Sequence, residues 1–231
     1  IPKSISKIGE YAFWFCSSPK SIIIPNNVIE IGKNAFEDCV FIKNIIIPEG
    51  VTEIKERTFK DCNKLKNITI PNTITMIDKN AFENCVSIKN IIIPEGVTEI
   101  SEYVFSGCKS LESIVIPNSV SKIGGHAFSE CESLKKIVIT ENIKKIGVNP
   151  FSWCSILERI DVSTENLIFD SREDCNAIIE TATDTLVIGC KSTIIPKSIS
   201  KIGEYAFYGC NLLQSIIIPE GVTEIGEYAF G

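Results

Sequence analysis

Ten cysteines and a single histidine are among the residues of this 231-residue chain that could supply a nucleophile or ligate a metal ion. Eight of the cysteines each follow a phenylalanine by three residues, and no two of these eight lie closer than 23 residues. Zinc sites usually contain cysteine pairs two to four residues apart. The spacing therefore predicts buried structural thiols and no metal site.

His126 and the carboxylates are the remaining candidates for catalysis. His126 lies in the segment GGHAF, at a position that holds Tyr or Asn in other copies of the segment, and no exposed nucleophile is expected beside it. One carboxylate spacing suits general acid and base catalysis, but it occurs repeatedly, at Glu49 with Glu53, Glu95 with Glu99, and Glu220 with Glu224. Because an active site is normally unique in a chain, we predict no enzyme activity, no catalytic residue and no cofactor.

The elements that must hold these residues repeat with a period of 23 residues. The period is marked by one phenylalanine in each unit, at Phe13, Phe36, Phe59, Phe82, Phe105, Phe128, Phe151, Phe207 and Phe230. A fixed period of this size predicts a solenoid, whose coils stack because one coil cannot bury its own apolar face. We expect each phenylalanine to plug the core of its coil and each cysteine to fill a narrow inward position.

Two segments of each unit have a recognisable pattern. One reads as a short strand that ends at a proline, with apolar residues at Leu65, Ile68 and Ile70. The other has apolar residues at offsets 0, 4, 5 and 8, which is the spacing of one face of a short helix, at Ile8, Ala12, Phe13 and Cys16. Each coil is therefore predicted to contain one strand and one helical or 3₁₀ turn.

The units, with the form IPEGVTEI…AF-x-x-C…L…I-x-I-P, resemble the leucine-rich repeat family and, within it, the BspA-like branch of bacterial and protist surface proteins. The resemblance implies an α/β solenoid with a parallel sheet on the concave side and short helical or 3₁₀ turns on the convex side. It also implies a non-enzymatic module, on the cell surface or secreted, that binds protein or glycan partners. We expect residues 1–231 to form a single solenoid and, because both ends fall inside a repeat, to be a fragment of a longer protein.

Residues 163–195 depart from the period, since they span 33 residues where a regular unit has 23. The segments NAIIE and TLVIG flank TATD there, which predicts a β-hairpin with a four-residue loop. If Glu180 pairs with Thr185, counting outward places Cys175 opposite Cys190, within range of a disulfide. The alternative is that Cys175 and Cys190 are free thiols that close the base of the hairpin as two small residues. A register slip of one residue would separate the two cysteines.

The strand residues between the core positions are predicted to form the partner-binding surface. One column is mostly basic and comprises Lys20, Lys43, Lys66, Lys89, Glu112, Lys135, Glu158 and Gln214. A second column is mostly β-branched and comprises Ile23, Ile46, Thr69, Ile92, Val115, Val138, Asp161 and Ile217. Such a surface suits an acidic or extended partner. Duplication of near-identical units, with lysines that keep the sheet soluble, explains the same columns without any ligand.

Composition narrows the choice of function. The net charge is −6 with Lys and Glu intermixed, so no basic stripe favours nucleic acid, and no apolar run approaches the ~20 residues that a membrane span needs. Two alternatives to a binding module remain. The first is a structural spacer or a solenoid that self-associates end to end, and the second, less favoured, is a parallel β-helix enzyme that acts on carbohydrate.

Overall fold

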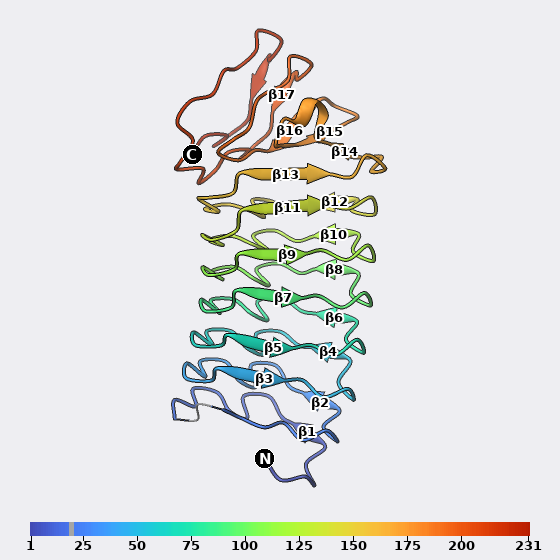
Figure 1. Ribbon diagram of the computed structural model, residues 1–231, viewed down its shortest axis with the longest axis vertical. Coiled ribbons are helices and arrows are strands. Elements are labelled where there is room, and N and C mark those ends of the chain that lie inside the picture. Colours follow the sequence, from blue (N-terminus) through green and yellow to red (C-terminus); the bar gives the residue numbers. More distant parts are fainter. Residues whose placement is uncertain (19–20) are drawn as a thin grey trace.

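The computed structural model describes residues 1–18 and 21–231 as a stack of coils, each lying on the one before (Figure 1). Two columns of short strands run along the stack. The first column consists of β3 (Asn44–Ile46), β5 (Asn67–Thr69), β7 (Asn90–Ile92), β9 (Ser113–Val115), β11 (Lys136–Ile139) and β13 (Arg159–Val162). The second consists of β1 (Lys7–Ile8), β2 (Glu30–Ile31), β4 (Glu53–Ile54), β6 (Met76–Ile77), β8 (Glu99–Ile100), β10 (Lys122–Ile123) and β12 (Lys145–Ile146).

Neighbouring coils pair in parallel with a displacement of 23 residues. In the first column Asn44 is the partner of Asn67 and Ile45 of Ile68, so that each residue lies beside its own equivalent in the next coil. The second column has the same register, with Lys7 opposite Glu30. The predicted repeat solenoid of 23-residue coils is confirmed.

The predicted helical turns are wrong. In the described residues the only helix is the 3₁₀ turn η1 (Arg172–Asp174), and no helix there has the length and apolar character that would carry it across a bilayer. Residues 10–15 instead form successive turns, in which Tyr11 and Phe15 have left-handed backbone angles of φ 55° and 56°. Alternate amides in these turns donate hydrogen bonds to the next coil, as the Phe13 amide does to the Ala35 carbonyl. In a helix they would bond within the same segment.

The phenylalanines form the predicted stack at the centre of the coils. Ring centroids of successive residues from Phe13 to Phe151 lie between 5.1 and 5.7 Å apart, with the rings within 17° of parallel. Ala35 and Ala81, directly before two of these rings, are fully buried, and other coils bury Thr58 and Val104 at the same position. Burying each ring favours folding by about 1.5–3 kcal/mol.

The cysteines are free thiols in the described residues, and six of them share one hydrogen-bond geometry. Each of the six donates its S–H to the carbonyl oxygen of the phenylalanine 26 residues earlier, at 3.0–3.3 Å, namely Cys39, Cys62, Cys85, Cys108, Cys131 and Cys154. Burial raises their pKa, to about 11 for Cys39 and about 12 for Cys108. The predicted structural role of these thiols therefore includes hydrogen bonding between coils as well as packing.

Asn166 ends the regular stack. It occupies the inward position that Val120 and Ile143 hold in the two preceding coils, and its side chain is buried. The Nδ2 group donates to the carbonyls of Thr140 and Ile143, at 2.8 and 3.0 Å, while Oδ1 accepts the amides of Ile168 and Phe169, both at 2.9 Å. With all four hydrogen bonds made, this buried amide directs the chain out of the repeat.

The predicted hairpin follows. Strand β14 (Phe169–Asp170) pairs antiparallel with β15 (Ile178–Glu180), which pairs antiparallel with β16 (Thr185–Ile188), and Glu180 is opposite Thr185 as expected. Strand β16 then rejoins the solenoid through parallel pairing with β17 (Lys201–Ile202), which pairs in turn with β18 (Glu224–Ile225). The irregular unit is therefore a hairpin inserted in the wall of the stack.

A bulge at Ile178 and Ile179 shifts the hairpin register toward its base, where Ile178 pairs with Ile188. Cys175 and Cys190 are both free and buried in this structure. The Cys190 thiol donates to the Asn176 carbonyl at 3.3 Å, and the Cys175 Sγ lies 3.6 Å from the Ser171 hydroxyl. A disulfide between them stays a prediction, which mass spectrometry under non-reducing conditions would test.

Candidate functional site

The outward side chains of the first strand column form a flat surface that we call the strand face. Each strand alternates between core and solvent, so Ile45 is buried while Asn44 and Ile46 are exposed. Because the register is constant, equivalent side chains of successive coils form straight columns. The strand face therefore presents the same chemistry from coil to coil.

An exposed apolar column is the main feature of the strand face. Ile46, Ile92, Val115 and Val138 lie in the strands at the predicted register, and Ile23 and Ile217 hold the same place in their repeat units; the exposed fractions range from 42% at Val138 to 85% at Ile217. Thr69 and Asp161 interrupt the column. Exposed apolar residues that occur singly are ordinary on a protein surface, but several of them at one position of successive coils are typical of a contact surface.

The lysine column lies beside the apolar one. Lys43, Lys66 and Lys135 are exposed and form no ion pair within the described part of the chain, whereas Lys89 Nζ lies 2.8 Å from Glu112 Oε1. The hydrogen bond from Lys89 lowers the pKa of the Glu112 carboxyl. Lys20, the first residue predicted for this column, lies outside the described residues. The column therefore offers several unpaired cationic groups to an acidic partner.

A third column was not identified from the sequence. Asn44, Asn67 and Asn90 lie between the lysines and the apolar residues, and the Asn67 side-chain amide donates to Asn44 Oδ1 at 2.7 Å. Ser113 continues this row by donating to Asn90 Oδ1 at 2.9 Å. The recurrence of Asn every 23 residues in the sequence could have revealed this column. The column gives the strand face polar groups that can hydrogen-bond a partner.

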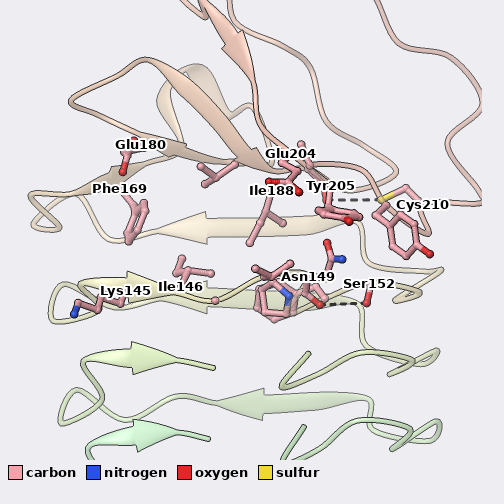
Figure 2. A pocket seen from close by; sticks show the side chains of 18 of the residues that line it. Lys145, Ile146, Asn149, Ser152, Phe169, Glu180, Ile188, Glu204, Tyr205 and Cys210 are labelled. Carbon is pink, nitrogen blue, oxygen red and sulfur yellow. Dashed lines mark hydrogen bonds between the residues drawn. The ribbon is translucent and has the colours of Figure 1, made fainter. Parts of the chain in front are cut away.

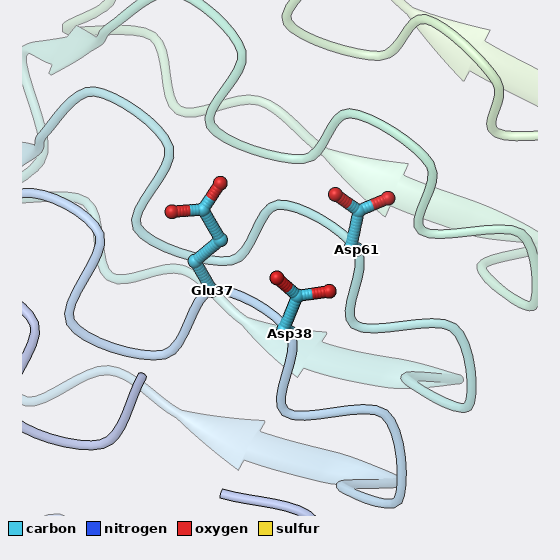
Figure 3. Close-up of side chains that lie close together, drawn as sticks. All are labelled: Glu37, Asp38 and Asp61. Atoms are coloured by element: carbon cyan, nitrogen blue, oxygen red, sulfur yellow. The ribbon is translucent and has the colours of Figure 1, made fainter. Parts of the chain in front are cut away.

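Glu37, Asp38 and Asp61 form a carboxylate cluster on the turns of two adjacent coils, with one oxygen from each residue within 4.8 Å of the others (Figure 3). Burial and the nearby Asp61 raise the pKa of Asp38. Asn84 Nδ2 donates to Asp61 Oδ1 at 2.9 Å, which orients that side chain. Carboxylates of this kind are ligands for Ca²⁺, but Ca²⁺ needs six to eight oxygens, so the cluster by itself assigns no ion.

A cleft of about 470 Å³ lies where the hairpin interrupts the stack. Ile146 points into it from β12, and Phe169 and Ile188 point into it from the hairpin strands (Figure 2). Lys145, Glu180 and Glu204 line its rim. The sequence predicted the hairpin but gave no sign of this cleft, since its walls come from segments far apart in the chain.

Sequence comparison identifies the repeat. The profile described as "BspA type Leucine rich repeat region (6 copies)" matches residues 1–112, 98–176 and 187–231. This chain belongs to the BspA-type leucine-rich repeat family. The resemblance seen in the repeated units is thereby confirmed. No protein of curated function matches the sequence.

Solved structures of bacterial leucine-rich repeat proteins have the same fold. A leucine-rich cell surface protein from Faecalibacterium prausnitzii A2-165 is 31% identical over 96% of this chain, with a TM-score of 0.83. This BspA-type chain spans 61% of the length of that protein. A leucine-rich repeat protein from Bacteroides ovatus is 27% identical over 98% of this chain and 68% of its own, with a TM-score of 0.55. The pneumococcal vaccine antigen PcpA, at 20% identity, 98% and 54% coverage and a TM-score of 0.66, shares the fold.

Proposed function

We propose that this chain is a non-enzymatic binding or adhesion module, held on or released from a cell surface, whose strand face recognises a protein or glycan partner. The observation that carries the proposal is the set of exposed β-branched side chains on the strand face, at Ile46, Ile92, Val115 and Val138, with unpaired lysines beside it. The family supports a protein-binding role, and the F. prausnitzii relative, a leucine-rich cell surface protein, supports a location at the cell surface. Repeated identical groups favour many weak contacts with an extended partner over one deep pocket.

The charge of the strand face favours an acidic partner. Lys43 and Lys66 lie in adjacent coils, whose strands are about 4.8 Å apart, so together they match a partner with closely spaced carboxylate or sulfate groups. The neighbouring apolar column adds contact area that is insensitive to salt. We therefore expect binding that weakens at high ionic strength but is not abolished by it.

The proposal is tested by reversing three charges on the strand face. The variant Lys43→Glu, Lys66→Glu and Lys89→Glu should lose capture of partners from extracellular matrix and serum, while keeping the thermal stability of the wild type. A control with the same change in charge is Lys3→Glu, Lys64→Glu and Lys197→Glu, because these lysines are exposed and stand outside the three columns. Unchanged capture by the first variant would exclude the lysine column from binding.

Self-association is the second candidate function, because an exposed apolar column can also pair with a copy of itself. End-to-end joining of solenoids is one form of such assembly, and a structural spacer is its consequence. Light scattering at increasing protein concentration separates the two functions, since a particle mass that stays at 25.5 kDa would exclude assembly. Hydrolysis of a polysaccharide that depends on one carboxylate would instead point to an enzyme.

A further inference from the structure

The cleft at the hairpin lies beside the free edge of a strand. Strand β12 is the terminal strand of its sheet, whose order is β12, β10, β8. Phe169 follows Ile146 by 23 residues and would be its partner in a regular stack, but β14 pairs with β15 instead. Within the described residues no backbone hydrogen bond joins residues 144–151 to the coil that follows.

Four backbone groups are left open along this edge. In the preceding coil the carbonyls of Ser121 and Ile123 accept amides from the next coil at 2.8 Å, and the amides of His126 and Phe128 donate to carbonyls there at 3.0 and 2.8 Å. The equivalent groups 23 residues later lack such partners, namely the carbonyls of Lys144 and Ile146 and the amides of Asn149 and Phe151. An edge that presents free backbone acceptors, followed along the chain by free donors, is a template for an added segment of backbone.

The side chains on this edge indicate what kind of strand would fit. At the register position of Lys145, other coils pair lysine with glutamate across the column, with Lys7–Glu30, Lys122–Glu99 and Lys201–Glu224 at 3.0, 3.1 and 2.6 Å. Lys145 is exposed and forms no ion pair in the described structure. In those pairs the residue after the acid is an isoleucine, and the corresponding position here would face the cleft beside Ile146.

We propose that the free edge of residues 144–151 captures an extended peptide of a partner protein, which carries an acidic residue followed by a β-branched aliphatic residue and adds to β12 as a parallel strand. The acid pairs with Lys145, and the aliphatic side chain enters the cleft against Ile146, Phe169 and Ile188. This site is separate from the strand face, because it belongs to the second strand column and depends on backbone groups that a regular stack would cover.

The chain itself supplies a peptide with the required groups. In the segment VTEIGEYAF (222–230), the amides of Thr223 and Gly226 donate to Ser200 and Ile202 at 2.9 and 2.8 Å. Its carbonyls at Glu227 and Ala229 accept the amides of Tyr205 and Phe207 at 3.0 and 2.7 Å. The four residues that hold this segment are Ser200, Ile202, Tyr205 and Phe207. They lie 56 residues after Lys144, Ile146, Asn149 and Phe151, in that order. A synthetic peptide of this sequence is therefore a matched probe for the free edge.

The experiment measures fluorescence anisotropy of that labelled peptide on addition of the full chain. We expect saturable binding that Lys145→Glu weakens about fivefold, because like charges then face each other, and that a peptide with lysine in place of Glu224 restores on the variant. Lys64→Glu, an equal charge change on an exposed turn outside the cleft, should leave the affinity unchanged. N-methylation of the peptide at Gly226 should weaken binding about fivefold as well, since it removes the donor for the Ile146 carbonyl.

Several results would overturn the proposal. Absence of saturable binding up to millimolar peptide would do so, as would equal effects of Lys145→Glu and Lys64→Glu or full affinity of the N-methylated peptide. Self-association of the peptide-free chain that Lys145→Glu abolishes would identify a second copy, and not a partner protein, as the occupant. None of these results depends on Lys43, Lys66 or Lys89, so the two proposed surfaces can fail independently.

Discussion

The thiol of Cys85 donates a hydrogen bond to the carbonyl oxygen of Phe59, 3.1 Å away, and the same oxygen accepts the amide of Cys62 at 3.2 Å. The Phe59 carbonyl therefore accepts one hydrogen bond from its own coil and one from the next coil. Alanine would fill much of the same space but has no donor, and a larger apolar residue would not fit under the adjoining coil. The recurrence of cysteine after phenylalanine is explained by this combination of size and hydrogen bonding.

Replacing one buried ring should destabilise the solenoid strongly. Phe82→Ala is expected to lower the free energy of unfolding by about 3–5 kcal/mol, because it removes a buried ring that stacks on Phe59 and Phe105. Phe41→Ala is the matched control, since that ring is 46% exposed, and it should cost less than about 1 kcal/mol. Urea unfolding monitored by circular dichroism measures both. Similar losses in the two variants would contradict the central role of the stack.

The buried thiols should make the protein less stable in alkali. Burial raises the pKa of Cys108 to about 12 from an ordinary value near 9. The unfolded chain therefore releases this proton first, so the stabilisation is complete below about pH 9 and is lost as the pH rises toward 12.

Each such thiol should contribute about 1.4 kcal/mol of lost stability per pH unit in that window. Between pH 8 and 10.5, the free energy of unfolding of Cys108→Ala should consequently fall by about 2 kcal/mol less than that of the wild type. Urea unfolding at each pH measures both. Parallel losses in the two proteins would show that Cys108 ionises as readily in the folded state as in the unfolded chain.

Glu30 should contribute to stability in acid. Its carboxylate lies 2.6 Å from Lys55 Nζ and 3.0 Å from Lys7 Nζ, and these lysines, Lys55 first, lower its pKa from 4.5 to about 2. The contribution is present above the ordinary pKa and is lost as the pH falls from 4.5 through 2. Glu30→Gln should flatten the fall of the melting temperature in that window. Glu95→Gln, an exposed residue in no ion pair of the described structure, should leave the fall unchanged.

Asn166 should be required for the excursion of the chain into the hairpin. Asn166→Leu restores the apolar residue of the regular repeat but removes four hydrogen bonds to buried backbone, so we expect a loss of about 3 kcal/mol or more. Val120→Leu tests the added volume alone at the equivalent place in a regular coil. Hydrogen exchange should locate the change at residues 166–190. Faster exchange spread evenly along the chain would argue against a local role.

Periodicity was sufficient to predict the first strand column, the phenylalanine stack and the exposed columns, because each depends on one residue type recurring at 23. It did not predict the second strand column, since the spacing assigns Ile8 and its equivalents to the expected helical face. It failed at the turns, where the spacing of Ala12, Phe13 and Cys16 matches a helix although alternate amides bond to the next coil. Asn166 carried a signal, as a polar residue at a position where its counterparts are apolar. The cleft carried none, because it depends on which strand β14 pairs with, and local sequence does not specify that choice.

The missing hydrogen bonds beyond β12 should also govern how the molecule responds to tension. Between regular coils, amides that follow the short strands donate to the preceding coil, as Gly124 does to Ile100. Amides of the turns donate to the following coil, as Phe105 does to Ala127, so two sets of hydrogen bonds resist separation. At the hairpin much of this resistance is absent, and the buried side chains divide into two clusters around the same place. A molecule pulled from both ends should therefore yield there first, which would make the hairpin a built-in extension point under tension.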